Sequence, residues 1–128
     1  MAKQIIQTDN APKPIGPYNQ AVKTGELLFI SGQVAIDAET NELISGDVQA
    51  ETKQVMNNLQ AILTAAELTF EHVVKTTIFL TDMSLFSTVN EIYGSYFSGD
   101  YPARETVAVK GLPKNANVEI SMIAVLNL

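Results

Sequence analysis

The chain has 128 residues, of which 46% are hydrophobic and 17% charged, a balance typical of one compact globular domain and not of a disordered segment. It has no cysteine, which excludes disulfides, thiolate nucleophiles and cysteine-bound metal centres. The net charge is −6 and the eight lysines and arginines are spread singly, so the sequence argues against a dedicated nucleic-acid-binding protein.

The amino-terminal part of the chain predicts short strands separated by turns. We expect strands at 3–8, 18–23 and 27–36, with a proline-rich connector at 11–17 that cannot be helical and a polar, turn-prone segment at 37–46. The first ten residues lack the apolar segment of a secretory signal, and no apolar run approaches the roughly 20 residues needed to span a bilayer. We therefore expect a cytoplasmic protein without a membrane segment.

Two helices and three further strands are predicted in the rest of the chain. Asp47 is a good N-cap for a helix that the apolar spacing extends to about residue 67. A β-branched strand follows at 72–81, and Ser84 is the candidate cap of a second helix. We expect the last two strands, at 105–110 and 118–128, to form an antiparallel hairpin through the turn-rich segment 111–117. These elements predict a single α+β domain over residues 1–128.

The last strand is apolar on much of both faces. Its even positions are all apolar from Val118 to Leu126, and Ile123 and Val125 are apolar as well. Strands of this kind need cover on both sides, yet two helices would cover only one face of the sheet. A bare apolar sheet face indicates a protein partner, and we therefore expect a homo-oligomer.

Glu119 stands out because it interrupts this apolar strand, where carboxylates are rare unless something pairs with them. If the last two strands form a hairpin, Arg104 lies opposite or diagonal to Glu119. One interpretation is a salt bridge that neutralises a half-buried acid. The other is an anion clamp beside a catalytic carboxylate, because arginine holds a carboxylate in a two-pronged fork and stays charged at any working pH. The residues alone leave both interpretations open.

Other single residues carry weaker signals. Gly32 in mid-strand indicates either a bulge or a close approach of the backbone to a ligand. Tyr18 and Asn90 fit ordinary structural roles on their own, the former as a packed ring and the latter as a solvated helix residue. His72 is the single histidine and has no ligand partners at metal spacing, so we expect no metal site.

Taken together, the segments IGPYNQA, FISGQV, VVKTTIFLTDMSLFSTVNEIY, YPARETVAV and GLPKNANVEISMIAV resemble the RidA (YjgF-type) family of imine deaminases. The match spans nearly the whole chain in order, and the pattern PAR-x-x-V-x-V followed by LP and VEI is its most specific part. The resemblance implies a chorismate-mutase-like mixed sheet with two helices on one face, assembled as a homotrimer with three ligand clefts between subunits.

The resemblance also implies an activity. Family members hydrolyse 2-imino acids or their enamine tautomers, such as 2-aminoacrylate and 2-aminocrotonate, to 2-keto acids and ammonia, without cofactor or metal. These intermediates are released by pyridoxal-phosphate-dependent dehydratases. Arg104 matches the carboxylate-binding arginine and Glu119 the acid that holds the attacking water. The matching substrate-binding positions, with Thr106 acting through its backbone, are Tyr18, Ser31, Gly32, Asn90 and Thr106.

The sequence departs from the family at two positions near the implied site. Thr106 stands where many members have cysteine, so thiol chemistry is excluded, and Ser121 stands where a second acid often follows the VEI motif. Two other functions stay open. One is a non-catalytic module that binds a keto acid or amino acid and regulates amino-acid biosynthesis. The other, against which the acidic charge argues, is a ribonuclease or translation inhibitor.

Overall fold

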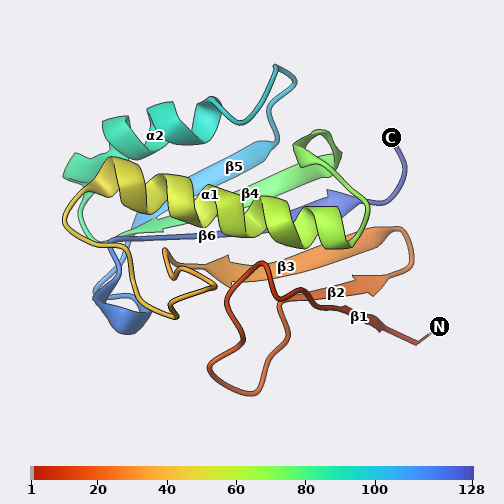
Figure 1. Cartoon of the computed structure of the whole chain (residues 1–128). Helices are drawn as coiled ribbons and strands as arrows, with labels where there is room; N and C mark the ends of the chain where they lie inside the picture. Colours follow the sequence, from red (N-terminus) through yellow and green to blue (C-terminus); the bar gives the residue numbers. More distant parts are fainter. Residues whose placement is uncertain (1) are drawn as a thin grey trace.

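The computed structural model describes residues 2–128 as one six-stranded sheet with two α-helices on the same face (Figure 1). The sheet order is β1-β2-β3-β6-β4-β5, and the pairs are antiparallel except for β4 and β5, which are parallel. This mixed sheet confirms the predicted α+β class. Its strands are β1 (Gln4–Ile6), β2 (Ala21–Thr24), β3 (Leu27–Gln33), β4 (Val73–Leu80), β5 (Ala103–Ala108) and β6 (Val118–Val125).

The first helix, α1 (Val48–Ala65), begins as predicted. The side chain of Asp47 accepts a hydrogen bond from the Gln49 N–H at 2.9 Å and so satisfies a backbone donor that has no partner within the helix. The second helix, α2 (Phe86–Gly94), begins differently. Asp82, not Ser84, caps the short 3₁₀ turn Met83–Leu85 that leads into it, because the Asp82 carboxylate accepts a hydrogen bond from the Ser84 N–H at 2.8 Å.

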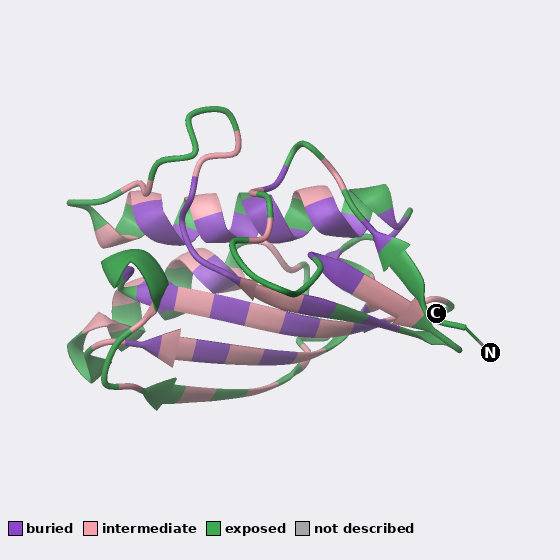
Figure 2. Cartoon of the chain, turned by 90° about the horizontal axis from the view of Figure 1, so that it is seen from below, coloured by how far each residue is buried: buried purple, intermediate pink, exposed green. Residues whose placement is uncertain are grey.

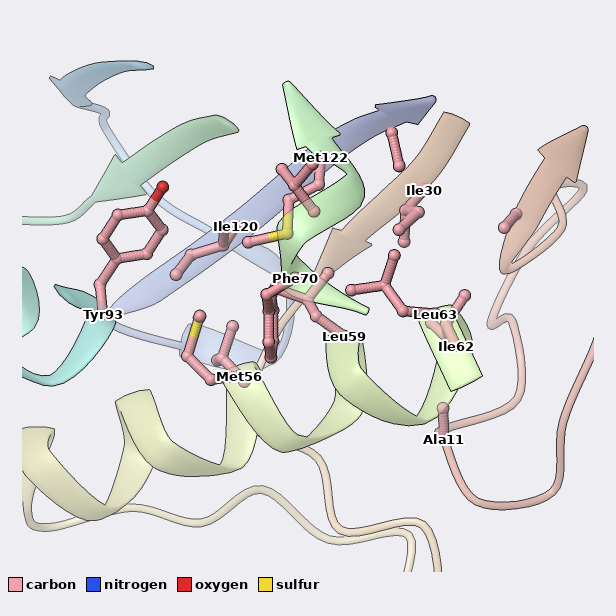
Figure 3. Packing of buried hydrophobic residues seen from close by; sticks show 14 of the residues in the cluster. Ala11, Ile30, Met56, Leu59, Ile62, Leu63, Phe70, Tyr93, Ile120 and Met122 are labelled. Atoms are coloured by element: carbon pink, nitrogen blue, oxygen red, sulfur yellow. The ribbon is translucent and has the colours of Figure 1, made fainter. Parts of the chain in front are cut away.

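The hydrophobic core lies between α1 and the sheet. Figure 3 shows side chains of α1 directed toward β3 and β6, and the residues that meet there are nearly all fully buried. Truncating one of these aliphatic side chains to alanine would cost about 2–5 kcal/mol. The central members of this core are Leu28, Ile30, Val55, Met56, Leu59, Ile62, Leu63, Ile120 and Met122.

The opposite face of the sheet is only partly covered. In Figure 2, buried and partly exposed residues alternate along the strands, as expected when one face packs on helices and the other does not. Phe29, Val107 and Leu27 on the uncovered face are 42%, 41% and 36% exposed. The predicted bare apolar face is therefore present, whereas the homo-oligomer inferred from it stays a prediction. No helix within residues 2–128 is both long and apolar enough to cross a membrane.

The predicted hairpin of the last two strands is wrong. β4 lies between β5 and β6 and pairs with both of them. Parallel strands need a crossover connection, and α2 supplies it between β4 and β5. The segment 109–117 then passes over the end of β4, where Val109 N–H donates to the Leu80 carbonyl and Thr81 N–H donates to the Asn117 carbonyl.

Candidate active site

Glu119 lies on the uncovered face of β6, against a bulge in β3. The register of β3 and β6 shifts between Ile30 and Gln33, so the bulge predicted at Gly32 is confirmed. A β-carbon built on Gly32 would lie 2.7 Å from Glu119 Oε2 and 2.8 Å from its Cδ, closer than side chains tolerate. The missing side chain at Gly32 therefore leaves the room that the Glu119 carboxyl occupies.

A small cavity of about 50 Å³ adjoins this carboxyl, and we call it the Glu119 pocket. Its lining includes Tyr18, Gly32 and Glu119, three of the predicted site residues, together with Lys13 and Pro113. The Tyr18 side chain is 46% exposed, and its hydroxyl oxygen accepts a hydrogen bond from the Ile15 N–H at 3.2 Å. The proline-rich connector thus brings Tyr18 beside Glu119.

Two buried amide side chains hold the walls of the Glu119 pocket. Gln20 Nε2 donates to the carbonyls of Thr8, Ala11 and Pro12 at 3.0, 3.2 and 2.9 Å, which ties down the connector. Asn58 Nδ2 donates to the carbonyls of Val34 and Ile36 at 3.1 and 3.0 Å, which fixes the chain after the bulge. Buried polar groups with all their donors satisfied rigidify what they touch.

The electrostatic setting of Glu119 is unusual for an acid in an apolar strand. Burial raises the pKa of its carboxyl above the ordinary value. Within residues 2–128 the ion pair present is Lys75–Glu105, at 3.0 Å, and Glu119 has none. The interpretation of Glu119 as the partner of Arg104 in an intrachain salt bridge is therefore wrong.

Arg104 lies on β5 beneath α2. Its guanidinium carbon is 5.1 Å from the centre of the Tyr93 ring and 5.7 Å from that of Phe86, both within the range of cation–π attraction. The Tyr93 hydroxyl donates to Thr76 Oγ1 at 2.9 Å, so this ring is itself fixed to β4. An open cavity of about 540 Å³, the Arg104 pocket, is lined by Asn90, Glu91, Tyr93, Gly94, Tyr101, Pro102 and Arg104.

The two remaining predicted site residues lie near these pockets without lining either. Thr106 follows Arg104 by two positions on β5 and shares its face of the sheet. Its Oγ1 is the one buried side-chain oxygen or nitrogen without a hydrogen-bond partner in the described part of the chain. Ser31 sits in the bulge, and its hydroxyl donates to the Asn19 carbonyl at 2.6 Å.

Arg104 and Glu119 face opposite sides of the sheet in one chain. Thr76 of β4 is in register with both Arg104 and Met122, and the latter is buried under the helices. Glu119 is in register with Phe79, three residues further along β4, and so points the other way. The expectation that the two site residues are cross-strand neighbours is wrong, because β4 separates their strands.

A larger cavity lies elsewhere and contains none of the predicted site residues. It measures about 820 Å³ and is lined in part by Phe70, Tyr96 and Phe97. A large volume by itself does not indicate a reaction. We therefore place the candidate site at the two smaller pockets, which hold predicted site residues.

Several residues around these pockets were not predicted from the sequence. Lys13 and Tyr93 gave no local signal that distinguished them from ordinary loop and helix residues. Glu51 and Asn58 did give one, because each puts a polar side chain on the apolar face of the predicted first helix, and both are fully buried. This is the same signal that singled out Glu119.

Comparison with known proteins assigns the chain to a family. A family model described as Endoribonuclease L-PSP matches residues 8–126. Protein DfrA of Myxococcus xanthus is 53% identical over 98% of this chain and 97% of its own length. A mouse protein named 2-iminobutanoate/2-iminopropanoate deaminase is 49% identical over 96% of this chain and 91% of its own. The crystal structure of RidA from the Antarctic bacterium Psychrobacter sp. is similar with a TM-score of 0.92 at 46% identity, covering 95% of this chain and 98% of that one. The chain therefore belongs to the RidA (YjgF-type) family.

Proposed function

We propose that this protein hydrolyses reactive 2-imino acids and their enamine tautomers to 2-keto acids and ammonia. The substrates would be those released by pyridoxal-phosphate-dependent dehydratases, such as 2-aminoacrylate and 2-aminocrotonate, and the reaction would need no cofactor. The observation that carries the proposal is that the two pockets complement each other. One offers the Arg104 cation for a substrate carboxylate, and the other offers Glu119, a half-buried acid that makes no ion pair within residues 2–128. The name of the mouse relative supports the same reaction.

We propose further that each active site is a cleft shared by two copies of the chain. Arg104 and Glu119 face opposite sides of one sheet, so a single copy cannot direct both at one small substrate. In a cyclic assembly, one copy can present its Arg104 pocket to the Glu119 pocket of the next. A homotrimer with three such clefts fits the uncovered sheet face, which would line the interior of the assembly.

The first step is the capture of the substrate carboxylate by Arg104. The planar guanidinium can donate two parallel hydrogen bonds to a carboxylate, which fixes both the position and the orientation of the substrate. The rings of Tyr93 and Phe86 restrict the guanidinium before substrate arrives. Asn90 lines the Arg104 pocket and can add a polar contact, whereas Thr106, which lines neither pocket, would act through its backbone.

Hydrolysis then needs a positioned water and little further activation, because an imine carbon is already electrophilic. Glu119 takes a proton from the water as its oxygen bonds to C2, and the C=N electron pair moves to a protonated nitrogen. In the resulting carbinolamine Glu119 returns its proton to the nitrogen, the C–N bond breaks and its electron pair leaves with ammonia, and the Glu119 carboxylate thus regenerated accepts the next proton. The hydroxyl loses its proton to form the keto group. Burial, which raises the pKa of Glu119, makes the carboxylate a stronger base, whereas an arginine from a second copy would oppose this effect.

Two substitutions test the reaction. With an imine generated in place by threonine dehydratase, wild-type protein should accelerate ammonia release and Arg104→Ala should abolish the acceleration. Glu119→Gln should lower kcat by roughly 10²-fold or more while 2-keto acid binding, measured by calorimetry, persists. A non-catalytic regulator would instead show no acceleration in any form. Full activity in Arg104→Ala would refute the deaminase assignment.

Mixed assemblies test whether the site is shared. Arg104→Ala and Glu119→Gln chains should each be inactive alone, but refolding them together should restore about a quarter of wild-type activity in a random mixture, since each mixed trimer then has one intact cleft. A site built within one copy would give no recovery. Recovery would therefore establish both the shared cleft and the roles of the two residues.

The endoribonuclease description of the family model is a second candidate function for this chain. The net charge of −6 argues against it. The single histidine does too, because His72 Nδ1 already accepts a hydrogen bond from the Thr69 N–H in a local capping box. Cleavage of single-stranded RNA by wild-type protein, lost in Glu119→Gln, would favour this alternative.

A further inference from the structure

Glu51 is a carboxylate buried in the hydrophobic core without a cation beside it. It lies on the first turns of α1, is 1% exposed, and makes no ion pair with any residue from 2 to 128. Its two oxygens instead accept three hydrogen bonds: 2.7 Å from the Asn117 N–H, 3.2 Å from the Val118 N–H and 3.0 Å from Asn117 Nδ2. A buried charge of this kind is retained only where its partners satisfy it.

All three donors belong to the two residues that directly precede Glu119. Asn117 is also tied to the end of β4, where Thr81 N–H donates to its carbonyl at 3.1 Å and the Thr81 hydroxyl donates to its Oδ1 at 3.3 Å. The start of β6 is therefore held from two elements, and Glu51 contributes the hydrogen bonds from α1. The pairing of β6 with β3 ends at Ile120, so Val118 and Glu119 are paired with β4 alone, and the hydrogen bonds from Glu51 add a second anchor there.

The position of Glu119 leaves little room for the start of β6 to move. On one side the Glu119 carboxyl packs so closely on Gly32 that a single added carbon would lie 2.7 Å away. On the other side, the chain that carries it is fixed at Asn117 and Val118 by Glu51. A small shift of this segment would therefore move the Glu119 carboxyl away from Gly32 and out of its half-buried position.

We propose that Glu51 is a positioning residue for Glu119. Its buried carboxylate holds the backbone from which Glu119 projects, so that the Glu119 carboxyl stays against the Gly32 bulge and at the mouth of the Glu119 pocket. The catalytic significance of this role rests on the proposed function, whereas the positioning itself does not.

The titration of the Glu119 carboxyl, followed by carbon-13 NMR, tests the positioning without any substrate. Glu51→Leu removes the three hydrogen bonds that hold the start of β6. The Glu119 carboxyl should then reach solvent, and its titration midpoint should move down toward that of an ordinary glutamate. Glu51→Gln keeps one acceptor oxygen for the two backbone N–H groups but loses the hydrogen bond from Asn117 Nδ2, so its midpoint should lie between those of Glu51→Leu and the wild type. Lys13 and Tyr18, the other titratable residues of the pocket, are unchanged in every variant.

Two further variants keep this experiment decisive. Thr52→Val is the matched control: Thr52 is 0% exposed on the same helix, and its hydroxyl bonds only within α1, to the Val48 carbonyl at 2.7 Å. It should leave the Glu119 midpoint unchanged even where it lowers stability. Asn117→Ala, at an exposed position, removes one of the three hydrogen bonds and should give a smaller shift in the same direction as Glu51→Leu. An unshifted midpoint in both Glu51→Leu and Asn117→Ala would overturn the proposal.

Steady-state kinetics separates this proposal from the proposed function. If wild-type protein deaminates 2-imino acids, Glu51→Leu should lower kcat by up to about 10²-fold with little change in KM, because substrate still binds at Arg104 while the base is misplaced. Turnover in the wild type with an unaltered kcat in Glu51→Leu would contradict the positioning role alone. Absence of turnover in the wild type would contradict the proposed function and leave the NMR result to decide on Glu51.

Discussion

At the scale of single residues, Glu119 combines two properties that seldom occur together. It interrupts an apolar strand, and it makes no ion pair in the described chain. Burial consequently raises the pKa of its carboxyl. When the Glu119 carboxyl is ionised, its partial burial lowers the stability of the folded protein. An acid whose pKa is raised in this way is a candidate for a functional role.

The raised pKa predicts how stability depends on pH. Between the ordinary pKa of glutamate and the raised one, the folded protein keeps a proton that the unfolded chain has released, so stability decreases as the pH rises through this window. Glu119→Gln does not titrate and should lack this decrease. Urea unfolding across this pH window gives the free energy of unfolding of both proteins. We expect the difference between them to grow in favour of the variant as the pH rises. Parallel profiles for the two proteins would show that burial does not perturb Glu119.

At the scale of elements, the bulge in β3 connects backbone geometry to the site. The extra residue bends β3 and brings Gly32 against the Glu119 carboxyl. The connector before β2 and the segment after β3 form the other walls, held by Gln20 and Asn58. The pocket is thus built from three irregular segments, two of which are tied to the regular fold by a buried hydrogen-bonding side chain.

Gly32→Ala should impair function more than folding. The added carbon meets the end of a side chain that can rotate away, so the free energy of unfolding should fall by no more than about 1–3 kcal/mol. Displacement of the base should nevertheless lower kcat by about 10²-fold. Gly111→Ala is the matched control, because a carbon added there has no atom within 4 Å. Wild-type kcat in Gly32→Ala would show that the close packing of Glu119 is not required.

At the scale of the whole molecule, the sheet has one face that the helices do not cover. Phe29, Val107 and Leu27 keep between a third and a half of their surface exposed there. The opposed placement of Arg104 and Glu119 gives an independent reason for assembly. A second copy could cover the exposed sheet face and could bring an Arg104 pocket to a Glu119 pocket.

A charge on the uncovered face should dissociate the proposed homo-oligomer. Phe29→Glu places a carboxylate on the sheet face and should lower the mass measured by analytical ultracentrifugation toward that of one chain. The proposed deaminase activity should be lost with it, although Arg104 and Glu119 are both present. Leu128→Glu, at the 81% exposed carboxy-terminal residue, is the control and should change neither property. An unchanged mass for Phe29→Glu would exclude this face as the interface.

Local patterns determined much of this fold. The helical spacing and the Asp47 cap correctly predicted the start of α1, the β-branched run predicted β4, and the mid-strand glycine predicted the bulge. These features depend on interactions between residues close in the chain or on the periodicity of a single element, both of which a sequence displays directly. The isolated acid in β6 was singled out by a pattern of the same kind, and its role in function stays a prediction.

The pairing of strands was decided only by the tertiary structure. β5 and β6 are consecutive and joined by a turn-rich segment, which favoured a hairpin, yet β4 can form hydrogen bonds at both edges and lies between them. The helix between β4 and β5 already indicated a parallel crossover, a signal that the turn residues outweighed in the prediction. Because β4 lies between β5 and β6, Arg104 on β5 is not a neighbour of Glu119 on β6. Which face a side chain occupies depends on register, a property of two strands at once, and so a single strand's sequence cannot specify it.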